Sequence, residues 1–140
     1  DKIVSIVVAI AVSIANYFLG GWDLALKTLL LFMALDYILG VLCGGKKKKL
    51  SSKIAFNGIL KKVAILIVVT VAVALDNAIH GQGLLRSLVL FFYIGLEGIS
   101  ILENATILGV AVPEKLRDAL DQLKEGNKKE IVEEGENIDG

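Results

Sequence analysis

A lysine-rich segment between two long apolar runs is the feature that most limits what this chain can fold into. Residues 44–62 read GGKKKKLSSKIAFNGILKK and hold seven of the 15 Lys and Arg residues. Short basic segments between apolar runs stay on the cytoplasmic side of a membrane, because moving them across opposes the membrane potential. We expect the segment to fix the topology and to contact anionic lipids through Lys46, Lys47, Lys48, Lys49, Lys53, Lys61 and Lys62.

The composition indicates an integral membrane protein. Of the 140 residues 55% are hydrophobic, and the mean hydropathy is +0.70. A soluble domain of this size could not hide that much apolar surface. The formal charge of zero averages the basic segment and an acidic C-terminal region, so no nucleic-acid partner is predicted. The single cysteine, Cys43, excludes an internal disulfide.

Four segments are predicted to span the membrane, at residues 3–19, 24–43, 59–79 and 84–108. Residues 3–19 carry no charge and are just long enough to cross the hydrocarbon core; a signal peptide is the competing interpretation. In the third segment, residues 63–75 are uncharged but too few alone. If that segment stays at the interface, the number of spans falls to three and one end of the chain changes sides.

The predicted fold is therefore an all-α integral membrane protein with four transmembrane helices in two hairpins. Residues 1–112 form the transmembrane domain, with a basic cytoplasmic loop at 44–58. Residues 113–125 are expected to form a cytoplasmic amphipathic helix, with Leu116, Leu120 and Leu123 at helical spacing. Residues 126–140 are polar and acidic and are expected to be a disordered tail. Both termini are expected in the cytoplasm.

Polar side chains inside the apolar segments are the candidate functional residues. Asp36 lies deep in the second span and shares a helix face with Gly40. A polar stripe is predicted on the fourth segment because its residues recur at helical spacing, and ionisable groups at such depth face protein or water rather than lipid. The alternative is that the span ends near Gly95 or Gly98. The stripe and its neighbour are Arg86, Tyr93, Glu97, Ser100, Glu103 and Asn104.

The first span presents small and polar residues on one face. Such a face lets helices approach closely and hydrogen-bond in lipid. The equally simple alternative is that alanine and serine are common in membrane helices. The residues that predict helix packing are Ser5, Ala9, Ser13 and Asn16.

No motif of an enzyme, a metal site or a cofactor site is found. The sequence contains no HExxH, GxSxG, P-loop or paired-cysteine motif. The single histidine, His80, lies in a glycine-containing turn without a partner at ligand spacing. We therefore expect no enzymatic activity and no cofactor. A pore-forming oligomer, a small ion or solute transporter, and a membrane scaffold remain as candidate functions.

Several short stretches in matching order resemble the toxin-secretion and phage-lysis holins of Gram-positive bacteria and their phages. They cover residues 29–124, and one departure is Leu96-Glu97, where the family has an Asn-Glu pair. The stretches are Leu35-Asp36-Tyr37 with Gly40-Val41, Leu50-Ser51-Ser52-Lys53, Gly58-Ile59, Lys61-Lys62, Leu75-Asp76, Phe92-Tyr93-Ile94, Glu97-Gly98, Ser100-Ile101-Leu102-Glu103-Asn104 and Pro113-Glu114-Lys115-Leu116.

The resemblance implies a homo-oligomer in the bacterial cytoplasmic membrane. Its lesions would release an endolysin or, in some relatives, a toxin, and no catalytic residue would be needed. We expect the polar stripe to line the lesion or join subunits, and Asp36 to pair with Lys27 or Arg86 of a neighbouring subunit. A small channel or transporter, or a scaffold or holin antagonist that makes no hole, is the alternative.

Overall fold

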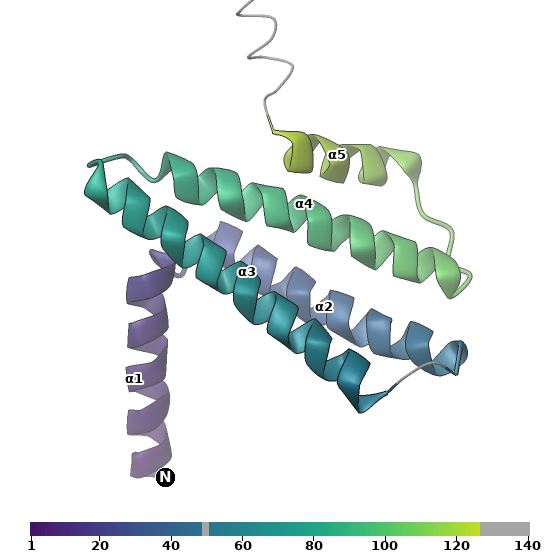
Figure 1. Cartoon of the computed structure of the whole chain (residues 1–140), viewed down its shortest axis with the longest axis horizontal. Coiled ribbons are helices and arrows are strands. Elements are labelled where there is room, and N and C mark those ends of the chain that lie inside the picture. The colour runs from purple at the N-terminus through teal and green to yellow at the C-terminus, as the bar shows by residue number, and fades with distance from the viewer. Residues whose placement is uncertain (49–50, 127–140) are drawn as a thin grey trace, which may run out of the picture.

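The computed structural model describes residues 1–48 and 51–126, and these form five α-helices (Figure 1). In the described residues four helices are long and apolar enough to cross a membrane, and a short fifth helix follows them. This confirms the predicted all-helical membrane fold. The helices are α1 (Lys2–Leu19), α2 (Leu24–Lys46), α3 (Ser52–Ala78), α4 (Leu84–Ile107) and α5 (Glu114–Glu125).

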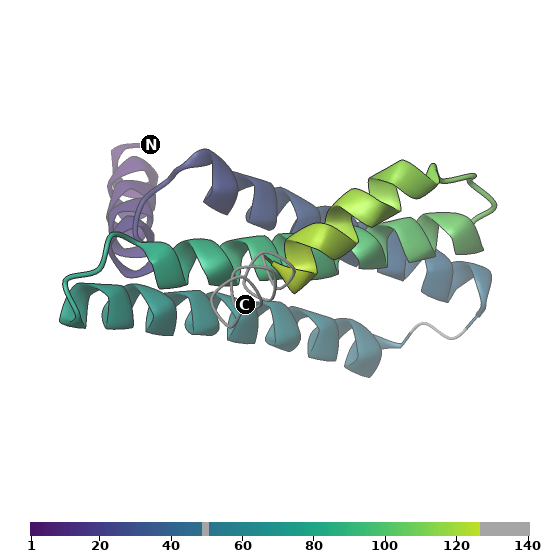
Figure 2. The ribbon, with the colours of Figure 1, turned by 90° about the horizontal axis from the view of Figure 1, so that it is seen from above.

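Helix α4 is the centre of the structure. It packs against α2, α3 and α5, and Figure 2 shows it between α2 and α3 with α5 crossing over it. Burial of apolar side chains from α2, α3 and α4 holds the three long helices together. The buried core consists mainly of Leu26, Leu29, Met33, Ile65, Val69, Val73, Leu90 and Ile94.

Helix α1 stands at a steep angle to the other long helices and meets them at its C-terminal end (Figures 1 and 2). It packs on α3, and Leu19 is its one buried residue. Two glycines with positive φ, Gly20 at 81° and Gly21 at 122°, turn the chain between α1 and α2. The first predicted hairpin, α1 and α2, is thus an open corner rather than two helices packed side by side. The second, α3 and α4, does pack as a hairpin.

The basic segment is more helical than predicted. Helix α2 continues through two glycines to Lys46, where a cation is favourable at a helix C-terminus. Helix α3 begins at Ser52, because the Ser51 side chain accepts a hydrogen bond from the Ile54 amide at 3.2 Å. The predicted loop 44–58 is therefore confined to the short connection between these helices. Lys49 and the predicted tail from residue 127 onward lie outside the described residues.

Candidate functional site

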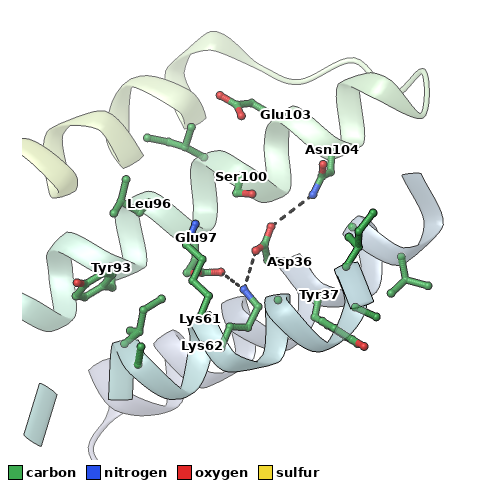
Figure 3. Close-up of a pocket in the computed structure, with 18 of the residues that line it drawn as sticks. Asp36, Tyr37, Lys61, Lys62, Tyr93, Leu96, Glu97, Ser100, Glu103 and Asn104 are labelled. Carbon is green, nitrogen blue, oxygen red and sulfur yellow. Dashed lines mark hydrogen bonds and ion pairs between the residues drawn. The ribbon is translucent and has the colours of Figure 1, made fainter. Parts of the chain in front are cut away.

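Three charged side chains from three different helices meet inside the bundle. The Lys62 ammonium donates to Asp36 Oδ2 and to Glu97 Oε2, each at 2.8 Å (Figure 3). The side chains of Lys62 and Asp36 are each 16% exposed and that of Glu97 is 7% exposed. Pairing lowers the cost of placing charges away from water. We call Asp36, Lys62 and Glu97 the ionic cluster.

The ionic cluster lies in a single layer across the bundle. Asp36 is ten residues before the end of α2 at Lys46, and Lys62 is ten residues after the start of α3 at Ser52. Glu97 is ten residues before the end of α4 at Ile107. At the helical rise per residue, each group lies about 15 Å from that end of the bundle. The charges therefore lie near the middle of the three spans.

Polar groups of α4 extend the ionic cluster toward the lysine-rich end. Asn104 Nδ2 lies 3.4 Å from Asp36 Oδ1 (Figure 3). Ser100 and Asn104 line a cavity of about 740 Å³ together with the cluster. Throughout residues 1–48 and 51–126, no fully buried side-chain nitrogen or oxygen lacks a hydrogen-bond partner. The isolated chain thus satisfies its buried polar groups internally.

The structure brings together most residues of the predicted polar stripe. The same cavity is lined by Asp36, Gly40, Tyr93, Glu97, Ser100, Glu103 and Asn104. Their predicted roles in a lesion or a subunit contact remain predictions. Two lysines from the basic segment also line it, namely Lys61 and Lys62.

The position of Lys62 differs from the prediction. It was expected to reach the membrane interface with Lys61, but its ammonium is held by two carboxylates inside the bundle. Adjacent residues on a helix point about 100° apart, so Lys61 is exposed while Lys62 faces α2 and α4. Asp36 consequently pairs within its own chain. The sequence held one signal for this position: Ser51 can cap a helix that begins at Ser52, and Lys62 lies ten residues into that helix.

Arg86 lies at the opposite end of the bundle from the rest of the predicted stripe. Its Nη1 donates to Asp23 Oδ2 at 2.6 Å, and its Nη2 donates to Asp23 Oδ1 at 3.1 Å. Its Nε donates to the Leu19 carbonyl at 2.7 Å, and Nη2 also reaches the Gly21 carbonyl at 2.9 Å. A guanidinium can bind a carboxylate and carbonyl oxygens simultaneously. Arg86 therefore joins the α1–α2 corner to α4.

Asp76, a residue of α3, caps the N-terminus of α4. Gly83 precedes α4 and has no side chain to cap it. Instead, the buried Asp76 carboxylate accepts from the amide of Leu85 at 3.1 Å and from that of Arg86 at 2.8 Å. A carboxylate suits the positive end of a helix dipole. Asp76 and Arg86 thus organise the end of the bundle farthest from the lysine-rich segment.

The Asp23–Arg86 pair predicts a change at this corner in acid. The hydrogen bond from Arg86 holds the pKa of Asp23 below its ordinary value. Because the folded-state pKa is the lower one, the pair stabilises the corner above the unfolded-state pKa of about 4. This stabilisation is lost as the pH falls through the lowered pKa. We expect the emission of the neighbouring Trp22 in micelles to change on acidification, and to change less in Asp23→Asn.

The matched control for that titration is Asp118→Asn, which removes an exposed carboxylate of α5. It should follow the wild-type fluorescence curve. An Asp23→Asn curve that superimposes on the wild-type curve would show that the Asp23–Arg86 pair does not control the corner.

The small and polar face of α1 is exposed in this structure. Ser5, Ala9 and Ser13 are exposed, and Asn16 is exposed as well. The Ser5 hydroxyl donates to the carbonyl of Asp1 within the same helix end. Packing of this face against another helix remains a prediction.

Comparison with known proteins identifies related chains. Residues 13–125 match the model of the Bacteriophage holin family. A 14.9 kDa protein from the nagH 3' region of Clostridium perfringens is 51% identical over 81% of this chain and 86% of its own length. The Listeria monocytogenes protein Lmo0128 is 44% identical over 77% of each chain.

A phage protein is also similar. A probable holin of Bacillus phage phi105 is 34% identical over 84% of this chain and 87% of its own length. No solved structure matches the chain.

Proposed function

Because the chain belongs to the bacteriophage holin family, we propose that it oligomerises in the bacterial cytoplasmic membrane and forms lesions. An endolysin or a toxin would leave the cell through them. The observation that carries the proposal is the ionic cluster in the middle of three apolar helices. Charges at this depth are costly in lipid and usually serve a function.

The ionic cluster suggests how the same chain can exist both as a separate subunit and as part of a water-filled lesion. With all groups ionised, one lysine and two carboxylates leave a formal charge of −1. In the isolated bundle, Lys62 donates to both carboxylates and Asn104 also contacts Asp36. In an assembly, the same groups can exchange an internal partner for water or a neighbouring subunit. The excess negative charge favours that exchange, because water solvates it better than protein does.

The proposed topology places the lysine-rich end of the bundle in the cytoplasm. The exposed lysines at that end include Lys47, Lys48 and Lys53, and each lysine near an anionic surface contributes about 1 kcal/mol of attraction. Lys46 donates to the Ile107 carbonyl at 3.1 Å, so the end of α4 lies at the same side. Both termini are cytoplasmic if α1 crosses the membrane beside the α2–α4 bundle.

The test of function is inducible expression in a bacterium together with an endolysin that lacks its own export signal. Abrupt lysis only when both proteins are present supports a hole large enough for a folded enzyme. Ion leakage without endolysin release would indicate a small channel or transporter instead. No effect from protein confirmed in the membrane would indicate a scaffold or antagonist.

The same assay tests the ionic cluster. Asp36→Asn or Glu97→Gln removes one carboxylate and leaves a formally neutral cluster, which has less to gain from water. We expect later lysis and smaller oligomers from either variant, measured by culture turbidity and by chemical cross-linking. Asp118→Asn, on the exposed surface of α5, should lyse on the wild-type schedule. Unchanged timing and oligomer size in both cluster variants would remove the ionic cluster from the mechanism.

A further inference from the structure

Helix α5 is docked on the middle of α4. A Cβ on Gly95 would come within 2.7 Å of both the Leu120 carbonyl oxygen and the Lys124 amide nitrogen, so the two helices meet backbone to backbone there. Gly95 lies about 17 Å from either end of α4. Figure 2 shows α5 crossing α4. Docked α5 therefore reaches from the lysine-rich end of the bundle to the middle of a membrane span.

The outward surface of docked α5 requires water. Its exposed residues include Glu114, Lys115, Arg117 and Glu125, and charged side chains are costly in hydrocarbon. Within the described part of the chain, α5 packs mainly on α4, so the other helices do not cover this surface. A single subunit surrounded by lipid supplies neither water nor polar protein at this depth. In a membrane, docking of α5 is therefore possible only where water reaches the middle of the bilayer.

The side of the bundle away from α5 has the opposite character. It is formed by α2 and α3 (Figures 1 and 2). In residues 29–42 of α2 and 63–75 of α3, every exposed residue is apolar or glycine. The large ones include Leu31, Leu35, Ile38, Ile67, Val71 and Leu75. Hydrocarbon accommodates an uncharged apolar surface. The bundle thus has one side that suits lipid and another that suits water.

The cavity of the ionic cluster extends to α5. Lys124 of α5 lines this cavity together with Asp36, Lys62 and Glu97. Water around docked α5 is therefore adjacent to the charges in the middle of the bundle. The two features that are costly in lipid, the charged surface of α5 and the ionic cluster, lie on connected surfaces of one subunit.

We propose that α5 lines the lumen of the assembled lesion. While lipid surrounds a subunit, α5 stays undocked on the cytoplasmic side. When subunits assemble with the α2–α3 side toward lipid, α5 enters from the lysine-rich end, docks on α4 and turns its charged surface to the water. This inference rests on the proposed function, since it assumes that subunits assemble around water.

The first test asks when α5 docks, in full-length protein reconstituted in liposomes that contain a labelled dextran of protein size. In Cys43→Ala protein, Gly98→Cys and Leu120→Cys form a contact pair. The nearest atoms to a Cβ at position 98 are the Leu120 methyls, which the second substitution removes. The control pair is Gly98→Cys with Leu116→Cys, because Leu116 lies one turn before Leu120 and is 48% exposed. Docking is measured as loss of both thiols from protein that stays monomeric on a denaturing gel.

The docked fraction should follow dextran release. At protein-to-lipid ratios that retain dextran, the contact pair should oxidise no faster than the control pair. At ratios that release dextran it should oxidise several-fold faster, and the oxidised lesions should still pass dextran. Equal oxidation of the contact pair in both preparations, or loss of dextran passage on oxidation, would overturn the proposal. A second pair, Glu103→Cys with Arg117→Cys joined by a bismaleimide, repeats the comparison with both glycines unchanged.

The same measurement separates this inference from the proposed function. Dextran release without faster oxidation of the contact pair would contradict the inference alone. Release of a small dye but not of dextran, with the contact pair oxidised, would contradict the proposed function and leave α5 in the lumen of a smaller channel.

The second test places a bulky group in the lumen. In Cys43→Ala protein, Gln122→Cys puts a thiol on α5 at an exposed position, about 200° around the helix from Leu120. Ser52→Cys puts one at the exposed start of α3. Lesions are formed first and labelled with a maleimide that carries polyethylene glycol, and entry of fluorescent dextran is then followed. The label at position 122 should slow entry several-fold, and the label at position 52 should leave it nearly unchanged. Equal effects would place α5 at the mouth of the lesion and overturn the proposal.

Discussion

Replacing Lys62 with methionine is expected to lower the free energy of unfolding by about 3–5 kcal/mol, the cost of removing one partner from a buried ion pair. Methionine keeps the length and apolar stem of the lysine but leaves Asp36 and Glu97 facing each other without a cation. The two carboxylates then carry a formal charge of −2 in a partly buried layer. Titration of sodium dodecyl sulfate into detergent-solubilised protein, followed by helical circular dichroism, measures the loss.

Two comparisons isolate the ionic cluster as the cause. Lys61→Met makes the same substitution at the adjacent exposed residue, and we expect a change within about 0.5 kcal/mol. The triple variant Lys62→Met, Asp36→Asn, Glu97→Gln removes all three charges and should recover most of the lost stability, because polar neutral groups are cheaper to bury than unpaired charges. Equal effects of Lys61→Met and Lys62→Met would show that the cluster does not stabilise the fold.

Local patterns in the sequence predicted the class of protein correctly, and the structure and the family match confirm the all-helical fold and the family resemblance. Apolar length and lysine placement are properties of contiguous residues, so they can be read without knowing which helices touch. The polar stripe on α4 is also local, because helical spacing alone places Glu97, Ser100 and Asn104 on one face.

Pairings between helices could not be predicted in this way. Lys62 belongs to a run of lysines, and only the rotation of α3 against α2 and α4 shows that it differs from Lys61. Arg86 has the spacing of the stripe but lies in the first turn of α4, where its partner is Asp23 at the start of α2. The leucines of α5 predicted an apolar face, whereas the contact of α5 with Gly95 depends on the path of the chain between α4 and α5.

Replacing Arg86 with methionine is the second large change we expect. The substitution removes four hydrogen bonds to Asp23, Leu19 and Gly21. It should cost about 1.5–3 kcal/mol, the range for hydrogen bonds to a charged group. The Arg86 side chain is 11% exposed, so water replaces its contacts incompletely. The same detergent titration measures the loss, and Trp22 emission should shift to the red as α1 separates from the bundle.

Two further variants, Arg86→Lys and Arg117→Met, separate the contribution of the Arg86 hydrogen bonds from that of a positive charge. A lysine at position 86 keeps the charge but cannot bind a carboxylate and two carbonyl oxygens in one plane, so its stability should fall between wild type and Arg86→Met. Arg117 is 56% exposed and 3.7 Å from Glu103, and its replacement should cost less than about 1 kcal/mol. Gly20 leaves room for the Arg86 side chain, because a Cβ at position 20 would lie 2.7 Å from Arg86 Nε. If Arg86→Lys is as stable as wild type, charge alone holds α1 to α4 and the planar hydrogen-bond geometry is unimportant.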